Sequence, residues 1–179
     1  MEKMIKKKLD WGVTKPFVIS FIENEIFNLN CYESVYPVQK DDIVLDIGAS
    51  IGPFTWKIMD KASKVHIVEP MIDLIPTIKK NTNGFPVNII KIDCEGGEYH
   101  LFRDENMEFL KTVRNIVGEF HLLSKEHIIE FRYFRDKYLT QFNNYEIRSI
   151  DNLDIKWDLF NDNFLNYYEQ IMVHISNEK

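Results

Sequence analysis

The chain has 179 residues, 45% hydrophobic and 28% charged, which suits one globular domain and argues against two. Its formal net charge of -6 gives no general attraction to nucleic acid or anionic lipid, so we expect neither as a partner. Two cysteines, Cys31 and Cys94, are too few for a disulfide framework. No apolar run approaches the roughly 18–20 residues of a membrane span, and no signal peptide opens the chain, so we expect a cytoplasmic protein without membrane contact.

Short apolar runs alternate with longer amphipathic segments along the chain. Strands are predicted over 42–48, 64–70, 87–93, 113–121, 145–150 and 167–175. Helices are predicted over 53–62, where Pro53 takes the first helical position, and over 124–142, where Ser124 is the N-cap. The alternation predicts a mostly parallel α/β sandwich, whose closing pair of strands is antiparallel because no helix of suitable length separates them.

The turn from the first strand to the first helix carries glycines at the place where such folds bind ligands. Asp46, Gly48 and Gly52 lie on this turn, where missing side chains let a ligand approach the backbone. Glu69, 23 residues after Asp46, ends the next strand and is followed by Pro70. A carboxylate at that distance is typical of folds that bind the two hydroxyls of a ribose. The pattern therefore indicates a nucleoside-containing cofactor.

A dense acidic stretch follows the third apolar run. Asp93, Glu95 and Glu98 lie within six positions of one another and straddle the glycine pair at 96–97. Asp93 ends a central strand, at the edge of the sheet where ligands bind. Negative charge there complements a cationic cofactor, and the glycine pair lets a substrate come close. Glu98 fits the start of the next helix, where acidic residues favour the dipole.

Four segments resemble, in order, the signature segments of the FkbM-type S-adenosylmethionine-dependent methyltransferases, a branch of the class I Rossmann-like group. They read DIVLDIGASIGPFT, VHIVEP, IIKIDCEGGEYHLF and IVGEFH, and the resemblance covers roughly residues 40–123. It implies a Rossmann-like sandwich of about six strands and S-adenosyl-L-methionine as the cofactor. It also implies an O-methyltransferase that acts on a hydroxyl of a sugar, glycan or other small molecule.

The resemblance places the cofactor along the glycine turn and two strand ends. The backbone at Gly48 and Ala49, with Asp46 beneath it, would hold the methionine part, and Glu69 the ribose. The full expected cofactor set is Asp46, Gly48, Ala49, Ser50, Gly52, Glu69, Pro70 and Asp93.

The expected catalytic residues are Asp93, Glu95 and His121, and the expected substrate residues are Glu119, His121 and Gly96. Asp93 and Glu95 would face the transferable methyl group. His121 is a candidate general base, or else a structural histidine bonded to a backbone carbonyl. The two carboxylates and His121 also suit a divalent ion, but nothing in the sequence fixes their spacing, so no metal is expected.

The chain departs from the family by its short connection between Pro70 and Val87. Only sixteen residues lie there, where the family has several dozen that include an edge strand. We therefore predict that strand 64–70 becomes an edge of a six-stranded sheet. Segment 72–80 should pack on the face away from helix 53–62, because parallel crossovers are right-handed. The adenine end of the crevice should then be open.

We expect a single methyltransferase-like domain over 1–179, with an N-terminal extension (1–40), a cofactor-binding core (41–123) and a C-terminal helix and strands (124–179). Two other classes stay open. One is a catalytically silent methyltransferase-like domain kept for binding or assembly. The other is a nicotinamide-dependent oxidoreductase, which the turn disfavours because Ser50 stands where the second glycine of the dinucleotide motif belongs.

Overall fold

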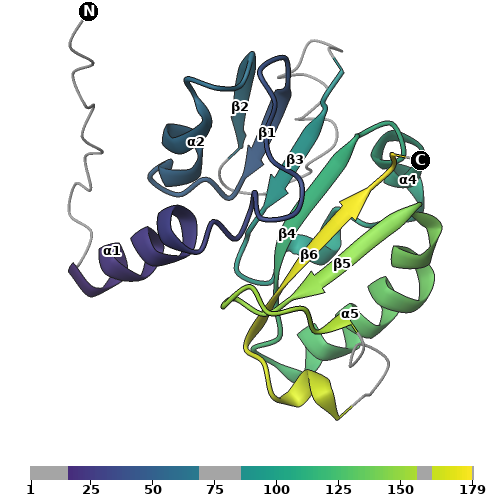
Figure 1. Ribbon diagram of the computed structural model, residues 1–179. Coiled ribbons are helices and arrows are strands. Elements are labelled where there is room, and N and C mark those ends of the chain that lie inside the picture. Colours follow the sequence, from purple (N-terminus) through teal and green to yellow (C-terminus); the bar gives the residue numbers. More distant parts are fainter. Residues whose placement is uncertain (1–15, 69–85, 157–162, 179) are drawn as a thin grey trace, which may run out of the picture.

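The computed structural model describes residues 16–68, 86–156 and 163–178 (Figure 1). Its helices are α1 (Pro16–Glu23), α2 (Pro53–Ile58), α4 (Asp104–Leu110) and α5 (Lys125–Lys137), with a π-helical turn over Asn24–Asn28 and 3-10 turns over Glu98–His100, Leu139–Gln141 and Phe164–Asn166. Its strands are β1 (Ile43–Ile47), β2 (Lys64–Val68), β3 (Ile89–Ile92), β4 (Asn115–His121), β5 (Asn144–Arg148) and β6 (Gln170–Ser176).

The six strands form one sheet in the order β2-β1-β3-β4-β6-β5. The first four are parallel, and β6 runs antiparallel between β4 and β5. This confirms the predicted Rossmann-like α/β sandwich, with a mostly parallel six-stranded sheet and an antiparallel C-terminal strand. Strand β2 is an edge within the described residues, as predicted. Glu69, Pro70 and segment 72–80 lie outside the described residues. The side of the sheet on which segment 72–80 packs therefore stays a prediction.

Both predicted helices form, although each is shorter than its amphipathic pattern. Helix α2 starts at Pro53 and ends at Ile58, because turns that bond Lys61 and Ala62 back to the Ile58 carbonyl bring the chain to β2. Helix α5 starts after its predicted cap, where the Ser124 hydroxyl accepts the His127 N–H at 3.1 Å. The rest of its predicted length is a 3-10 turn.

The sheet separates two apolar layers because successive strand residues point to opposite faces. On one face, Ile90 and Phe120 pack with Phe131 and Phe134 of α5 in the larger core. A smaller core lies on the other face, around α2 and the N-terminal segment. This core contains Val44, Ile89, Val117, Phe54 and Tyr32. Figure 1 shows α4 and α5 on the opposite side of the sheet from α1 and α2.

The N-terminal segment (16–40) is held on the second face by polar contacts to α2 and to the turn that follows it. The Lys57 ammonium donates to the Ile26 carbonyl at 2.6 Å, and Lys61 forms an ion pair with Glu33 at 2.6 Å. The Tyr32 ring meets Phe54 edge-on, with centroids 5.3 Å apart. These contacts bring Tyr32 to the carboxyl ends of the parallel strands. Within the part of the chain described, no helix combines the length and apolar character that crossing a bilayer requires.

Candidate active site at the carboxyl ends of the strands

The glycine turn between β1 and α2 lies directly against the end of β3. Gly48 has a φ of +71°, and a Cβ added there would lie 1.6 Å from the Asp93 carbonyl oxygen. Its missing side chain therefore makes room for the protein's own backbone and not for a ligand, contrary to our argument from the sequence. At Gly52, with a φ of +82°, no atom lies within 4 Å of an added Cβ. The open part of the turn is therefore at Gly52.

A buried ion pair supports this turn from below. Asp46 is fully buried, and its Oδ1 lies 3.3 Å from the Lys91 ammonium. Lys91 also donates to the Gly48 carbonyl at 2.9 Å and lies 3.6 Å from Asp93 Oδ2. Burial alone would lower the pKa of Lys91, but the charges of Asp93 and Asp46 raise it, so the ammonium stays charged. Asp46 thus holds the turn through Lys91.

Tyr32 joins the ends of two neighbouring strands. Its hydroxyl lies 3.0 Å from Asp93 Oδ2 and 2.9 Å from Glu119 Oε2. A phenol has one proton, so it donates to one of these carboxylates and must accept from the other. Burial, with the charges of Asp93 and Glu119, raises the pKa of Tyr32 well above its ordinary value. Tyr32 is not among the residues expected from the sequence, because nothing near position 32 marks it as facing a strand end.

Glu119 holds a proton in this surrounding. Burial, followed by the charges of Asp93 and Glu25, raises the pKa of Glu119 to about 10. Glu25, from the N-terminal segment, forms a hydrogen bond with Glu119, and burial raises its pKa as well. A proton on Glu119 reduces the repulsion that three bare carboxylates would have at this distance.

His121 is oriented by a buried carboxylate. Its Nδ1 lies 3.0 Å from Glu98 Oε1, which also accepts the backbone N–H groups of Cys94 and Gly96. Its Nε2 lies 3.5 Å from Glu95 Oε2 and 3.8 Å from Glu119 Oε1. Burial alone would lower the pKa of His121, but the bond to Glu98 and the surrounding carboxylates raise it. Glu98, expected only to start a helix, thus fixes the imidazole.

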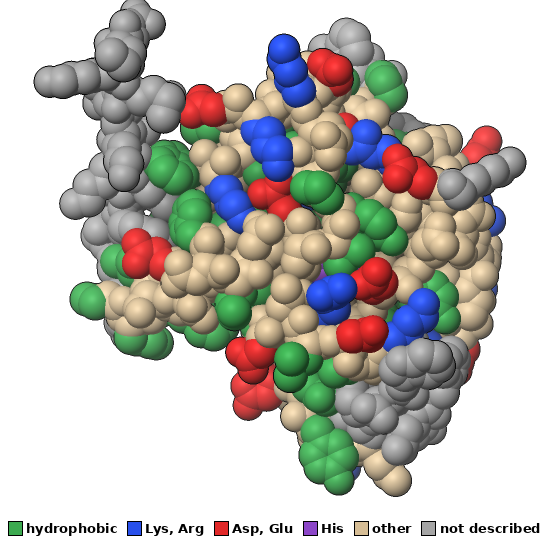
Figure 2. Space-filling model, in the orientation of Figure 1, with side chains coloured by type: hydrophobic (Ala, Val, Ile, Leu, Met, Phe, Trp, Pro, Cys, Tyr) green, Lys and Arg blue, Asp and Glu red, His purple; other side chains and the backbone are tan. Residues whose placement is uncertain are grey.

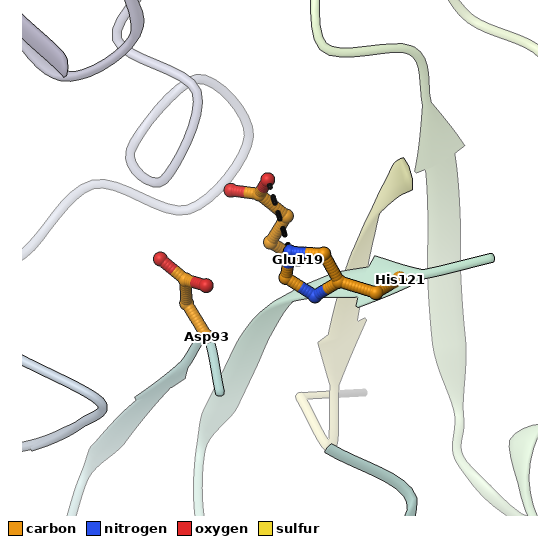
Figure 3. A group of neighbouring side chains, drawn as sticks. All are labelled: Asp93, Glu119 and His121. Atoms are coloured by element: carbon orange, nitrogen blue, oxygen red, sulfur yellow. Dashed lines mark ion pairs between the residues drawn. The ribbon is translucent and has the colours of Figure 1, made fainter. Parts of the chain in front are cut away.

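Three of the expected residues meet at one point. Asp93, Glu119 and His121 each offer a ligand atom, and these atoms lie within 4.8 Å of one another (Figure 3). The strands explain this, because Lys91 pairs with Val117, which puts Asp93 beside Glu119 at the next outward step. Residues two apart on a strand share a face, so His121 follows Glu119.

The remaining expected residues have different surroundings. Ala49 is buried, whereas Ser50 and Glu95 are non-glycine residues in the left-handed region, with φ of +51° and +52°. The Glu95 side chain is 84% exposed and lies over His121. The space beside Gly96 is occupied by the His127 ring, 2.4 Å from an added Cβ, so this glycine makes room for α5.

A hollow of 440 Å³ opens at the same edge of the sheet, beyond the end of β4. Its lining includes Leu123, Lys125 and Tyr167. Leu123 and Tyr167 are exposed, Tyr167 to 81%. Leu122, which lines this hollow, directly follows His121 in the chain, and its N–H donates to the Glu169 carbonyl at 2.6 Å.

The chain is similar in sequence or in structure to several methyltransferases. Over 85 residues, 44% of this chain, it is 31% identical to the ribosomal RNA small subunit methyltransferase A of Clostridium botulinum, and it spans 29% of that relative's length. The structure is similar to an rRNA methylase from Streptococcus thermophilus (10% identity, 94% and 99% of the two chains, TM-score 0.48). It is also similar to an O-methyltransferase from Bacillus cereus bound to S-adenosylhomocysteine, with 11% identity and a TM-score of 0.42. That similarity covers 94% of this chain and 84% of the other. No family model matches.

One expectation from the sequence is corrected by these comparisons. We expected no nucleic-acid partner because the chain is acidic, but the C. botulinum relative is named for ribosomal RNA. Net charge is an average over the whole surface, whereas binding depends on the local arrangement of charges. Figure 2 shows this mixture directly, with basic side chains interspersed among acidic ones on the face in view.

Proposed function

We propose that the protein is an S-adenosylmethionine-dependent methyltransferase that transfers the methyl group to a hydroxyl oxygen of a sugar, glycan or other small molecule. The observation that carries this proposal is the position of Asp93. Its backbone packs against the glycine turn at Gly48, and its side chain lies beside Glu119 and His121. One residue thus joins the expected cofactor turn to the polar cluster at which an acceptor would react.

The described residues fit the cofactor in two respects. The turn is open at Gly52, so a ligand can approach its backbone there. The Asp93 side chain is 28% exposed and negatively charged, which suits a neighbouring sulfonium. The turn would hold the methionine part, and Asp93 would lie near the methyl group. When bound, the cofactor supplies an electrophilic methyl carbon on a positively charged sulfur.

The protein's own groups would position the acceptor and take its proton. The acceptor oxygen forms a bond to the methyl carbon, the carbon–sulfur bond breaks, and its electron pair stays on sulfur. The hydroxyl proton must leave as the new bond forms. His121 Nε2 faces the cluster and is held there by Glu98, so it is placed to receive that proton. Glu95 would move aside, because its exposed side chain covers this nitrogen.

The hollow beside β4 is the place for the rest of the acceptor. Leu123 and Tyr167 offer exposed apolar surface next to polar groups, which suits the face of a sugar ring. The same surface suits a nucleotide base, since bases stack on aromatic side chains. RNA methylation is therefore a second candidate function, and the resemblance to the C. botulinum methyltransferase favours it.

The experiment that tests the proposal is calorimetric titration of the full chain with S-adenosylhomocysteine, followed by methyl transfer from radiolabelled S-adenosylmethionine. We expect saturable binding of S-adenosylhomocysteine and none of NAD. Asp93→Asn and His121→Ala should lower turnover more than cofactor affinity, since a positioned base contributes about 10²–10⁴-fold. Glu105→Gln, on the exposed face of α4, is the matched control. Absence of binding would favour the catalytically silent domain.

The acceptor is separated by a second arm of the same assay. Label transferred to a mixture of mono- and oligosaccharides supports the proposed O-methyl transfer. Label transferred to protein-free ribosomal RNA supports the second candidate. Tyr167→Ala should raise KM for either acceptor and leave cofactor affinity unchanged, because its exposed ring lies in the hollow and not at the glycine turn.

A further inference from the structure

We propose that Asp93, Glu119 and His121 form a binding site for a divalent transition-metal ion. Each residue offers one ligand atom within 4.8 Å of the other two, and the three come from two neighbouring strand ends (Figure 3). Carboxylates favour Mg²⁺ and Mn²⁺, whereas imidazole favours Zn²⁺ and Fe²⁺, so the mixed set suits Mn²⁺, Fe²⁺ or Zn²⁺. The proposal replaces our expectation from the sequence that no metal is bound.

The imidazole of His121 already has the surroundings of a metal ligand. A metal-binding histidine usually donates its second ring N–H to a carboxylate, which fixes the ring and the other nitrogen. Here Nδ1 lies 3.0 Å from Glu98, and two backbone N–H groups keep that carboxylate from turning. Nε2 is thereby aimed at Glu119, and Glu95 Oε2, 3.5 Å from Nε2, offers a further oxygen from the solvent side.

Tyr32 holds the two carboxylates in the same way. Its hydroxyl contacts one oxygen of Asp93 and Oε2 of Glu119, while Oε1 is the Glu119 oxygen nearest to His121. Each carboxylate can thus keep its bond to Tyr32 and use the other oxygen for a metal ion. Asp93 is partly exposed and the neighbouring Glu95 side chain is 84% exposed, so an ion can enter from their side.

One buried oxygen beside the cluster has no hydrogen-bond partner among the described residues. Glu25 is 6% exposed and bonds Glu119, yet its Oε1 has no hydrogen-bond partner in the described structure. Buried carboxylate oxygens normally have a partner. The Lys91 ammonium lies 3.6 Å from Asp93, but it also pairs with Asp46 and donates to the Gly48 carbonyl. A divalent ion between Asp93, Glu119 and His121 would displace the proton that Glu119 holds in the absence of an ion and would neutralise the carboxylates around it.

Such an ion would also select the acceptor, an inference that rests on the proposed function. A metal ion with open positions binds hydroxyl oxygens and lowers the pKa of their protons. In the metal-bound protein His121 Nε2 is a ligand, so the ion would replace it in activating the acceptor hydroxyl. Asp93 lies between the glycine turn and the cluster, so an ion on its side chain would be next to the expected methyl group. The site therefore fits an acceptor with two neighbouring hydroxyls, such as a vicinal diol of a sugar or ribose.

The test is titration of Mn²⁺ into the full chain after chelator treatment, followed by calorimetry and by loss of the free Mn²⁺ resonance. We expect one ion per chain. Asp93→Asn and Glu119→Gln should weaken Mn²⁺ binding by at least about tenfold, since even residues that only orient metal ligands contribute about 10–100-fold. Glu105→Gln, on the exposed face of α4, should bind Mn²⁺ like the parent. Thermal unfolding without metal identifies any variant that fails to fold.

Glu98→Gln provides a second and independent variant. Glutamine keeps the shape of the side chain but cannot hold the imidazole as a carboxylate does, so Mn²⁺ affinity should fall although no ligand is lost. Binding of one Mn²⁺ per chain that is weakened in Asp93→Asn and Glu119→Gln supports the site. No Mn²⁺ binding at millimolar concentration, or equal binding in Asp93→Asn and Glu119→Gln, would overturn it. Titration with S-adenosylhomocysteine in chelator tests the cofactor separately, so failure of either idea leaves the other standing.

Discussion

The Tyr32 hydroxyl lies 3.0 Å from Asp93 Oδ2, although the two residues are 61 positions apart. The same hydroxyl lies 2.9 Å from Glu119. The contact ties the N-terminal segment to the ends of β3 and β4. It also means that the expected methyl-facing carboxylate is positioned by a residue outside the segments that resemble the family.

Replacement of Tyr32 by phenylalanine tests this contact, because the ring and its packing on Phe54 are kept and only the hydroxyl is lost. Two buried or half-buried carboxylates then lose a hydrogen-bond partner, which should lower the free energy of unfolding by about 1–3 kcal/mol. Urea unfolding measures the change. Tyr167→Phe, whose hydroxyl is on an 81% exposed side chain, should change it by less than about 0.5 kcal/mol. Equal stability of the two variants would mean that the hydroxyl contacts contribute nothing.

The two glycines of the β1–α2 turn should respond differently to alanine. At Gly48 the new Cβ would meet the Asp93 carbonyl at 1.6 Å, so Gly48→Ala should cost more than about 3 kcal/mol or prevent folding. Gly52→Ala meets no atom and should cost only the left-handed strain of about 1–2 kcal/mol. If the cofactor lies along this turn, Gly52→Ala should also weaken S-adenosylhomocysteine binding. Urea unfolding and calorimetry measure both effects, and a Gly48→Ala variant as stable as Gly52→Ala would contradict the packing argument.

These differences show where sequence reasoning reaches its limit. The central strands follow from runs of apolar residues, because burial on both faces leaves a composition that is visible in one dimension. The edge strands β2 and β5 are only partly buried and follow from their β-branched and aromatic residues. Asp93, Glu119 and His121 could be assigned to one edge because parallel strands end together. The role of Gly48 could not be assigned, since a close approach between two backbones leaves the same glycine as a ligand does. Tyr32 and Glu25 could not be found, because long-range contacts of single polar residues have no periodic signal.

Lys91 had a weak signal that the sequence analysis did not use, since a lysine inside an apolar strand needs a buried partner. Removing its charge by Lys91→Met leaves Asp46 fully buried and uncompensated, which should cost about 3–5 kcal/mol. Adding Asp46→Asn removes the unpaired charge, so the double variant should lose less than the sum of the two single variants. Urea unfolding completes the cycle. Lys111→Met on the surface is the control, and strict additivity would show that the ion pair contributes no coupling.

Glu95 has a backbone conformation that L-residues adopt at a cost. Its φ is +52° and its side chain is 84% exposed, so Glu95→Gly should remove left-handed strain and raise the unfolding free energy by about 1 kcal/mol. Glu108→Gly, on exposed α4, should lower it by about 1 kcal/mol. Thermal and urea unfolding compare the pair. Destabilisation of both would indicate that the Glu95 side chain contributes more than its strain removes, which is the result expected if it contacts His121 strongly.

His174 should make the stability of the protein fall in mild acid. Its side chain is fully buried on β6, and neither ring nitrogen has a hydrogen-bond partner in the described structure. Burial and the charge of Arg148 lower the pKa of His174 to about 3, whereas an unfolded histidine has a pKa near 6.5. The unfolded state therefore binds a proton between these values that the folded state does not. The contribution of neutral His174 is complete above about pH 6.5 and decreases as the pH falls towards 3, by up to about 1.4 kcal/mol per pH unit.

His174→Leu removes this titration and fills the site with an apolar side chain of suitable size. From pH 7 to pH 5, the parent should lose about 2 kcal/mol more unfolding free energy than the variant does. Urea unfolding at pH 7, 6 and 5 measures both slopes. Ile175→Leu on the same strand is the matched control, because it changes a buried side chain without removing a titratable group. Carboxylates near Glu119 titrate in both proteins and cancel in the difference. Parallel slopes for the parent and His174→Leu would mean that His174 takes up its proton as readily in the folded protein as in the unfolded chain.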